Sequence, residues 1–295
     1  MPELPGKLYL VATPLGNLED ITFRALRILA EVDLIAAEDT RHTLKLLNHF
    51  QIKKSLISYY QHNERSRTDQ LLQKIQAGAD IALVSDAGMP GISDPGNLLV
   101  AEAVRQGITV IPIPGPTALI SALAASGLNT GSFWFEGFLP RKNTERRAKL
   151  LRMVEYEGTL VFYEAPHRLK QTLEAILEIL GDRPAVLARE LTKIHEEFIR
   201  DRLSEVLGII SRKELKGEFT ILIGGQTGNK TEDAAPEPGA KECNEGKGND
   251  PLEYIKEINP NSPSLRSELK KIAQKCGRST REIYQLYLRE NSQKK

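Results

Sequence analysis

Short apolar runs alternate with amphipathic stretches over the first 225 residues, and this alternation limits the folds that the chain can adopt. The apolar runs have the length of buried strands, and they cover residues 7–12, 34–37, 81–84, 109–113, 133–139, 159–163, 185–188 and 218–223. The amphipathic stretches between them fit helices at residues 21–29, 69–76, 98–105, 143–154 and 168–180, with Asp20 as the N-cap of the first. Strands that alternate with helices in this way predict an α/β fold with a largely parallel sheet.

The last quarter of the chain departs from this pattern. Residues 226–250 contain no Leu, Ile, Val, Met or aromatic side chain, so they cannot bury enough apolar surface to offset the entropy lost on ordering. We therefore predict an α/β domain over residues 1–118, a second α/β domain over residues 119–225, a disordered linker over residues 226–250 and a basic helical segment over residues 251–295.

The segment after the linker has the pattern of a small helical hairpin. Residues 264–288 fit helices, and Ala273, Gly277 and Ile283 have the spacing of a helix-turn-helix. Ten Lys and Arg face five Asp and Glu over residues 251–295. This hairpin fits nucleic-acid contact and simple packing on the body equally well.

The stretch VSDAGMPGISDPG, residues 84–96, follows a predicted strand and is dense in Gly and Pro. Glycine allows positive φ and close approach of the backbone, and proline fixes φ, so the stretch predicts a rigid, shaped loop. Similar turns follow the strands at residues 7–12 and 109–113. Ligands of parallel α/β sheets lie at the carboxyl ends of the strands, where all these loops are expected.

Several common sites are absent from the sequence. It has no G-x-x-x-x-G-K-[ST] phosphate loop, no G-x-G-x-x-G after the first strand, no H-E-x-x-H and no G-x-S-x-G. Its two cysteines form no metal or disulfide pattern. Polar main chain, small side chains and a few apolar walls suit an adenosine with an amino-acid tail, although each loop taken singly could be a plain βα turn.

Several motifs, in order, resemble those of one family. Residues 11–22, DAGMPGISDPG and PGPTALISALAASGL resemble three loops of the tetrapyrrole methylase superfamily. AAEDTR, YQHNE, FYEAPHRL and ARELTKIHEE are similar to one branch, the ribosomal RNA small subunit methyltransferase I family. The likeness covers about residues 7–225, and the terminal helical hairpin also fits it.

This resemblance implies two α/β domains with S-adenosylmethionine bound in a cleft between them, usually in a homodimer. It implies 2′-O-methylation of a cytidine ribose in the decoding region of 16S ribosomal RNA, with that RNA in the small ribosomal subunit as partner. The implied cofactor-binding residues are Pro14, Gly88, Met89, Ile92, Thr117, Ala118, Glu164 and Leu191. The sequence departs from the superfamily at two of them, because an acidic residue often stands where Met89 is and a methionine where Glu164 is.

Methyl transfer from a sulfonium depends on positioning, and a ribose hydroxyl benefits from a nearby base. Asp39 and Glu190 follow predicted strands and are candidate bases, although each could simply pair with a neighbouring Arg. Arg41, His62 and Asn63 are candidate RNA contacts, or His62 and Asn63 could cap a surface turn. Residues 141–152 hold six basic side chains and one acidic side chain. We therefore expect the phosphates of the RNA to contact Arg141, Lys142, Arg146 and Arg147. The alternative is that this stretch is only a solvated helix face.

The N-terminus has no apolar run long enough for a signal peptide or a membrane span, so we expect a cytoplasmic protein that needs no membrane and no metal. Two other functions stay open at this point. One is C-methylation of a tetrapyrrole on the same fold, which would not need the basic stretches. The other is a non-catalytic RNA-binding module on a methylase-like body.

Overall fold

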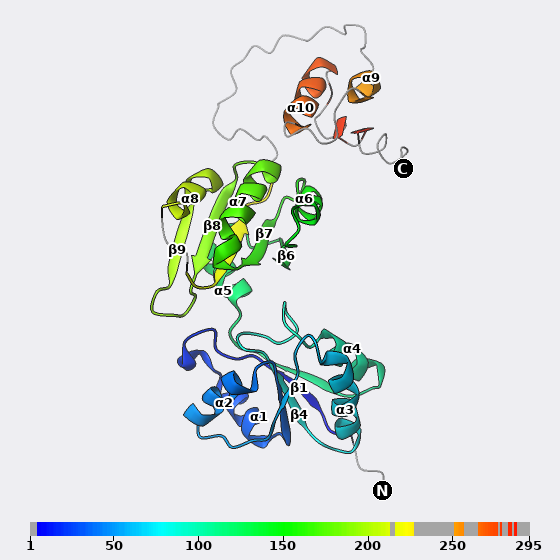
Figure 1. Ribbon diagram of the computed structural model, residues 1–295, viewed down its shortest axis with the longest axis vertical. Helices are drawn as coiled ribbons and strands as arrows, with labels where there is room; N and C mark the ends of the chain where they lie inside the picture. Colours follow the sequence, from blue (N-terminus) through cyan, green and yellow to red (C-terminus); the bar gives the residue numbers. More distant parts are fainter. Residues whose placement is uncertain are drawn as a thin grey trace. The chain divides into compact units, whose positions relative to one another are not determined.

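The structure is a computed structural model that describes residues 5–212, 216–226, 251–256 and 265–276, together with residues 278, 283, 284, 286 and 287. The chain divides into two compact units, Met1–Lys230 and Thr231–Lys295, and each is described here by itself. The first unit contains two five-stranded sheets (Figure 1).

The first sheet is wholly parallel, with the strand order β3-β2-β4-β1-β5. Its strands are β1 (Leu8–Val11), β2 (Leu34–Ala37), β3 (Leu56–Ser58), β4 (Ile81–Val84) and β5 (Val110–Ile113). Because all five run in one direction, the loops that follow β1, β2, β4 and β5 gather at one edge of this sheet. The expected strand positions at this edge are thus confirmed.

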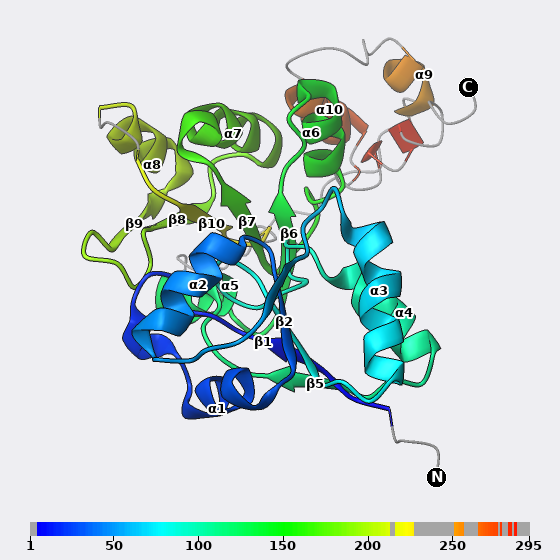
Figure 2. The same ribbon diagram turned by 60° about the horizontal axis from the view of Figure 1, so that its bottom comes forward.

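Helices cover both faces of the first sheet. They are α1 (Phe23–Glu31), α2 (Thr40–His49), α3 (Glu64–Gln76) and α4 (Asn97–Arg105), with α1 and α2 on one face and α3 and α4 on the other (Figures 1 and 2). Successive side chains of a strand point to opposite faces. Ala82 and Val84 of β4 therefore pack with the α1 side, while Ile81 and Leu83 pack with the α3 side. Burial on both faces explains why the strands read as continuous apolar runs.

The second sheet is mixed, with the order β6-β7-β10-β8-β9. Its strands are β6 (Phe133–Phe138), β7 (Thr159–Glu164), β8 (Pro184–Arg189), β9 (Glu197–Arg202) and β10 (Phe219–Ile223). Only β6 and β7 pair in parallel, and the other neighbours are antiparallel. The helices α6 (Asn143–Leu151), α7 (Pro166–Leu180) and α8 (Leu203–Ile210) pack on one face, and α5 (Ala118–Ser126) packs on the other.

The structure corrects several local predictions. Helix α1 begins at Phe23, and its N-cap is Thr22 instead of Asp20, because the Thr22 hydroxyl accepts the Ala25 N–H at 3.0 Å. Asp20 ends a short 3-10 helix, Leu18–Asp20. Helix α3 begins at Glu64, five residues earlier than predicted. Among the α-helices and strands described in residues 5–226, the sequence patterns also missed α2, β3, α5, β9 and α8.

The second unit has a small core of its own. Helices α9 (Pro251–Lys256) and α10 (Leu265–Cys276) contribute Ile255, Leu269 and Ile272, which pack with Ile283 and Tyr287. Most of the predicted linker, residues 227–250, lies outside the described residues, as does most of the predicted second helix of the hairpin. Gln226 belongs to the first unit, since its N–H donates to the Tyr156 carbonyl at 2.7 Å. In the described part of the chain, no helix is both long and apolar enough to span a bilayer.

Candidate active site

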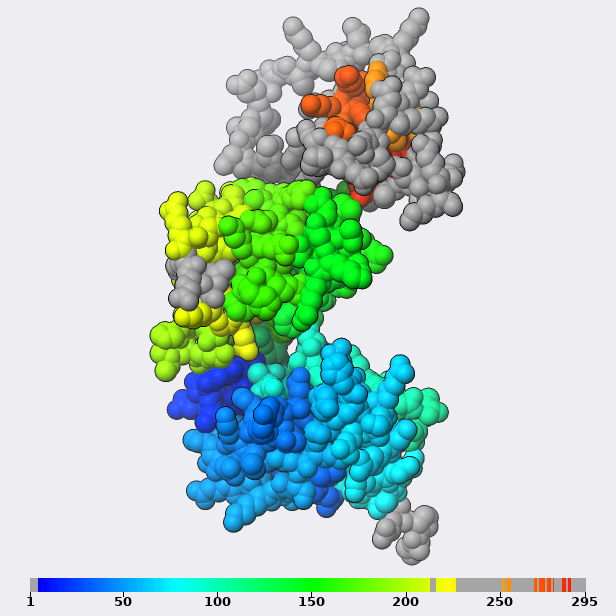
Figure 3. Space-filling model, viewed as in Figure 1, coloured from blue at the N-terminus to red at the C-terminus, as the bar shows by residue number. Residues whose placement is uncertain are grey.

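A cavity of about 540 Å³ opens where the two halves of the first unit meet. The first half contributes Leu15, Glu38 and the loop after β4, and the second half contributes the ends of β7 and β8 and the start of β10. Helix α5, which links the two sheets in sequence, lines it with its first residues. In the space-filling view the surface narrows where the blue-to-cyan half meets the green half (Figure 3). A cavity of this size, with mostly apolar walls and a few polar groups, is typical of small-molecule sites.

The loop after β4 is wound tightly along this cavity. Gly88, Gly91 and Gly96 have φ of 79°, 81° and 139°, and Ser93 shares this left-handed region with φ of 64°. Gly88 exchanges two hydrogen bonds of 2.9 Å with Thr13, so the loops after β1 and β4 are tied together. At its far end, the Gly96 N–H donates to the Glu64 carboxylate at 2.9 Å. These bonds hold the main chain of Gly88 and Met89 in the cavity wall.

The N-terminus of α5 forms a second part of the wall. Thr117 caps the helix by accepting the Ile120 N–H at 3.2 Å, and Ala118 follows it. The Leu119 N–H donates to the Tyr163 hydroxyl at 3.0 Å, which joins the start of α5 to the end of β7. Burial raises the pKa of Tyr163 to about 12, so the phenol stays protonated at neutral pH. Helix N-termini favour anionic groups, so this end of the cavity suits a carboxylate.

Three carboxylates from the first half also line the cavity, namely Glu38, Asp86 and Asp94. Burial raises the pKa of Asp94 to about 7, and the charges of Glu38 and Asp86 add to this rise against a hydrogen bond from Ser85. Burial also raises the pKa of Glu38, whose carboxylate accepts the Asp86 N–H at 3.4 Å. Asp86 in turn accepts the Asp39 N–H at 3.1 Å. This part of the cavity suits a cation.

Glu164 closes the cavity from the end of β7. Its buried carboxylate accepts hydrogen bonds from the Thr172 hydroxyl at 2.6 Å and the Ala165 N–H at 2.9 Å, and it lies 3.4 Å from the Arg168 guanidinium. The carboxylate is therefore compensated by the protein itself, and its first role is to hold the start of α7.

Most of the residues that the resemblance implies for the cofactor lie together here. Seven of the eight line the cavity, namely Gly88, Met89, Ile92, Thr117, Ala118, Glu164 and Leu191. Pro14 is buried beside the lining residue Leu15 and is not itself among the lining residues in the described chain. Their roles remain predictions, because adjacency alone does not assign a ligand.

The two candidate bases lie outside this cavity and are paired. Asp39 caps α2 by accepting the Arg41 N–H at 2.8 Å, and its carboxylate also binds the Arg41 guanidinium at 2.6 Å. These bonds hold the pKa of Asp39 well below its usual range, which makes it a poor base. The expected pairing of Asp39 with Arg41, the simpler alternative, is what the structure contains.

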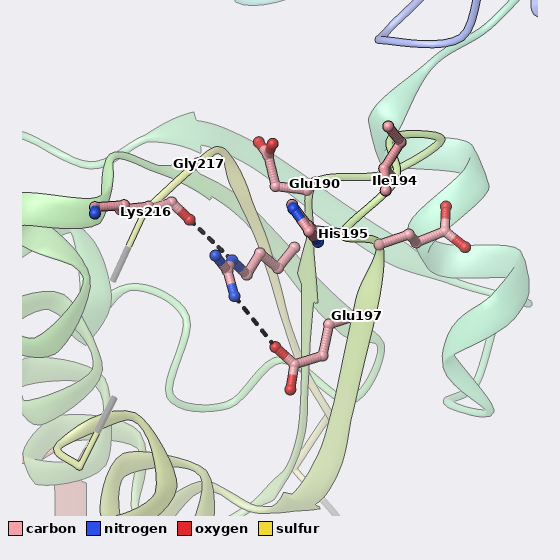
Figure 4. A pocket seen from close by; sticks show the side chains of 8 residues that line it. Glu190, Ile194, His195, Glu197, Lys216 and Gly217 are labelled. Atoms are coloured by element: carbon pink, nitrogen blue, oxygen red, sulfur yellow. Dashed lines mark hydrogen bonds and ion pairs between the residues drawn. The ribbon is translucent and has the colours of Figure 1, made fainter. Parts of the chain in front are cut away.

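Glu190 lines a second, more open hollow, shown in Figure 4 together with Ile194, His195 and Glu197. Burial opposes its ionisation, but a hydrogen bond from the Glu218 N–H and the ion pair with Lys193 outweigh it and lower the pKa of Glu190. Its partner is thus Lys193, whereas Arg189 donates to the Lys216 carbonyl at 2.8 Å and to Glu197 at 3.5 Å, as the dashed lines mark. The polar groups of this hollow largely satisfy one another.

The basic stretch on α6 divides into buried and exposed side chains, and the structure corrects one prediction here. Arg146 is only 1% exposed, and its guanidinium donates to Asn143 at 3.2 Å, so it cannot meet a phosphate in this conformation. Arg147 is paired with Glu178, and Lys142 lies 3.2 Å from Glu145 with 78% of its side chain exposed. Arg141 is exposed.

The YQHNE segment builds a turn. The Asn63 side chain accepts a hydrogen bond from the Tyr60 N–H at 2.8 Å and donates one to the Ser58 carbonyl at 3.1 Å. These two bonds stabilise the turn between β3 and α3. This is the capping alternative that the sequence left open. His62 is exposed beside Tyr60, with 6.2 Å between ring centres, and Arg41 is exposed as well. Neither lines the cavity, so their contact with RNA stays a prediction.

Sequence reasoning missed Glu38, Asp86, Asp94 and Tyr163. Two signals could have found three of them. Asp86 and Asp94 belong to the Gly/Pro loop itself, and Tyr163 ends a predicted strand, where ligands of α/β sheets are expected.

Comparison with known proteins places this chain in a family. A model of the family Tetrapyrrole (Corrin/Porphyrin) Methylases matches residues 7–207. A relative from Halalkalibacterium halodurans named Ribosomal RNA small subunit methyltransferase I is 48% identical over 285 residues, which cover 97% of this chain and 96% of the relative. The chain belongs to this ribosomal RNA methyltransferase family. A relative of the same name from Synechocystis is 56% identical over 223 residues, covering 75% of this chain and 80% of the relative.

Solved structures support the fold of this family member. Uroporphyrin-III C-methyl transferase from Thermus thermophilus, solved with S-adenyl homocysteine, matches with a TM-score of 0.55 and 22% identity over 74% of this chain and 97% of that one. The methyltransferase CobJ matches with a TM-score of 0.56 and 20% identity over 75% of this chain and 94% of that one. At these identities the likeness shows the fold alone. The predicted family, fold class and methyltransferase activity are confirmed.

Proposed function

We propose that this methyltransferase transfers the methyl group of S-adenosylmethionine to the ribose 2′-hydroxyl of a cytidine in the decoding region of 16S ribosomal RNA. It would act in the cytoplasm as a homodimer on the small ribosomal subunit. The observation that carries the proposal is the cavity between the two halves, in a chain that matches a ribosomal RNA methyltransferase over nearly its whole length.

The chemistry of the cavity fits the cofactor. S-adenosylmethionine carries a carboxylate, a cationic sulfonium and an adenosine. The N-terminus of α5 at Thr117 and Ala118 would hold the carboxylate, and the main chain at Met89, beside a Gly88 that has no side chain to interfere, would hold polar groups. Leu191 and Ile92 supply apolar surface for the adenosine. When bound, the cofactor supplies an activated methyl group.

The acidic wall also favours a cofactor that carries positive charge. Glu38, Asp86 and Asp94 would attract the sulfonium and the ammonium group. They would repel a porphyrinoid that carries carboxylates, whereas a ribose hydroxyl is neutral. This difference favours RNA over a tetrapyrrole as the acceptor.

The RNA would follow basic side chains outside the cavity. Arg141 and Lys142 are exposed before α6, and Arg147 would have to exchange Glu178 for a phosphate. Arg41 and His62 are exposed on the first half. Their contribution would be phosphate contact, which positions RNA without reading its sequence.

Two assays on the wild-type protein test this proposal. Calorimetry should show binding of S-adenosylmethionine, and labelled methyl groups should enter 16S RNA within small subunits more readily than a porphyrinoid. Nuclease digestion and mass spectrometry should then place the label on a cytidine ribose. A methyl group on a base, or label in the porphyrinoid alone, would overturn the assignment.

A further inference from the structure

The segment between β6 and α6 brings two exposed cations close to the cavity. Phe138, the last residue of β6, lines the cavity, and Arg141 and Lys142 are exposed three and four residues later. Three residues of extended chain span at most about 11 Å, so the main chain of Arg141 lies within that distance of the cavity wall. A phosphate bound at these cations would therefore belong to a nucleotide at or near the one whose ribose enters the cavity.

The guanidinium of Arg168, on α7, holds the start of this segment. Its Nη2 donates to the Leu139 carbonyl at 2.7 Å and to the Pro140 carbonyl at 3.4 Å. Its Nε lies 3.4 Å from Oε1 of Glu164, a side chain with no exposed surface. Because Glu164 also lines the cavity, Arg168 joins the basic segment to the cavity wall.

These contacts depend on the shape of an arginine side chain. A guanidinium carries five N–H donors in one plane, so it can contact two carbonyls and a carboxylate at once, whereas a lysine ammonium is a single point charge on a flexible stem. Leu139 and Pro140 lie outside the helices and strands, and a proline has no N–H to donate. Only 15% of the Arg168 side chain is exposed, so its bonds are largely shielded from water and keep this part of the chain in a defined place.

We propose that Arg168 is a positioning residue for the RNA, an inference that rests on the proposed methylation of ribosomal RNA. Arg168 fixes the carbonyls of Leu139 and Pro140, and the cations Arg141 and Lys142 are thereby held at a set distance from the cavity. Methyl transfer requires the acceptor oxygen, the methyl carbon and the sulfur to be aligned, and a misplacement of about 1 Å can slow such a step by about 10²-fold. In this role Arg168 itself contacts neither substrate.

Replacing Arg168 by lysine separates this role from the ion pair. Arg168→Lys keeps a positive charge beside Glu164 and loses the planar group that reaches both carbonyls. We expect single-turnover methylation of small ribosomal subunits, at saturating S-adenosylmethionine and saturating subunits, to slow by about 10–100-fold. Calorimetric affinity for S-adenosylmethionine should stay as in the wild type. An unchanged rate would overturn the proposal.

Arg183 provides a matched control for loss of stability. It is also buried, its guanidinium donates to the Leu180 carbonyl at 3.0 Å and the Val154 carbonyl at 2.6 Å, and it is not among the lining residues of the cavity in the described chain. Arg183→Lys should lower the urea midpoint as Arg168→Lys does and leave the methylation rate unchanged. An equal loss of rate in both variants would show that destabilisation explains the effect, and the proposal would fail.

A double-mutant cycle shows whether Arg168 acts through the two cations. Replacing Arg141 and Lys142 together by alanine removes the groups that Arg168 would position. Adding Arg168→Lys to that variant should then slow methylation by less than about twofold further. The same loss of rate with and without the cations would refute the proposed route.

A glycine inserted between Pro140 and Arg141 tests the placement without changing Arg168. The insertion keeps the net charge and moves the cations by up to about 3.5 Å, so methylation should slow as in Arg168→Lys. This variant decides the question even if Arg168→Lys does not fold, because a full rate after the insertion would show that no fixed position is needed. A wild type that methylates no ribosomal RNA refutes the proposed function. A wild type that does, with Arg168→Lys as active as Arg183→Lys, refutes only this inference.

Discussion

Replacing Gly88 by valine tests whether the main chain of the β4 loop forms the cofactor surface. Gly88 has a φ of 79°, and an added Cβ would meet only ordinary contacts, with Leu15 Cδ2 at 3.4 Å and the Pro116 carbonyl at 3.8 Å. The fold therefore has room for the side chain, and its direct cost is backbone strain of about 1–3 kcal/mol. A domain with a free energy of unfolding of about 5–15 kcal/mol tolerates that loss.

Gly127 provides a matched control. It has the same φ of 79°, nothing lies within 4 Å of an added Cβ, and it ends α5 at the helix terminus away from the cavity. Gly127→Val should thus carry a similar strain without adding atoms to the site. The γ-methyl groups of Gly88→Val, in contrast, would enter the cavity.

The assay is calorimetric titration with S-adenosylmethionine, together with urea unfolding of both variants. We expect similar losses of stability in the two proteins and a loss of affinity of at least tenfold, about 1.4 kcal/mol, in Gly88→Val alone. Unchanged affinity in Gly88→Val would remove this loop from the cofactor site. An equal loss in Gly127→Val would show that destabilisation, and not the cavity, explains the effect.

Four further predictions follow from the same contacts. Lys142→Ala should reduce the slope of log K for RNA against log salt by about 0.7, whereas Arg105→Ala, which breaks a comparable i,i+3 pair with 70% of the Arg side chain exposed, should leave the slope unchanged. Arg146→Ala should lower the free energy of unfolding by about 2–4 kcal/mol in urea titration, because it leaves a cavity, with no change in the salt slope. Deleting residues 251–295 should leave cofactor affinity intact in calorimetry, since that segment belongs to a separate unit, and should weaken RNA methylation most at high salt. Glu38→Gln should weaken binding of S-adenosylmethionine by about fivefold, of order 1 kcal/mol, and should weaken less the binding of the product S-adenosylhomocysteine, which lacks the sulfonium charge.

The Gly/Pro loop of the cavity wall was predictable from sequence because its shape depends on main-chain conformation. A loop that needs positive φ at several positions is expected to contain glycine, so Gly88, Gly91 and Gly96 can be recognised in the sequence itself. The strand before such a loop is equally visible, since β4 is buried on both faces and reads as one apolar run. The site follows because parallel strands present these loops at one edge.

The grouping of these carboxylates into one acidic wall was not predictable, because it depends on strand order. Glu38 and Asp86 are 48 residues apart and meet only because β2 and β4 are neighbours in the sheet. Nothing in the spacing of apolar runs reveals that order. The burial that raises the pKa of Asp94 likewise depends on the folded arrangement around the loop and not on its sequence.

Charge counting failed on α6 for a related reason. Six basic side chains in twelve residues suggest one surface, yet a helix presents its residues in several directions. Arg146 and Leu150 are four residues apart, so they share a face, and both are buried. The apolar partner at i+4 was the available signal that Arg146 points inward.

The acidic side chains inside the cavity and the basic side chains outside it would bind different groups of the two substrates. A ribosomal RNA substrate is polyanionic, and exposed cations such as Arg141 and Lys142 attract its phosphates over about 10 Å at physiological salt. The acidic wall of the cavity would have the opposite effect, because Glu38, Asp86 and Asp94 line it and would repel phosphates. A sugar hydroxyl carries no charge and escapes this repulsion, while a sulfonium is attracted by the same wall. After transfer the cofactor loses its sulfonium charge, so its attraction to this wall would weaken. The electrostatics that select a neutral acceptor would then also favour release of the products.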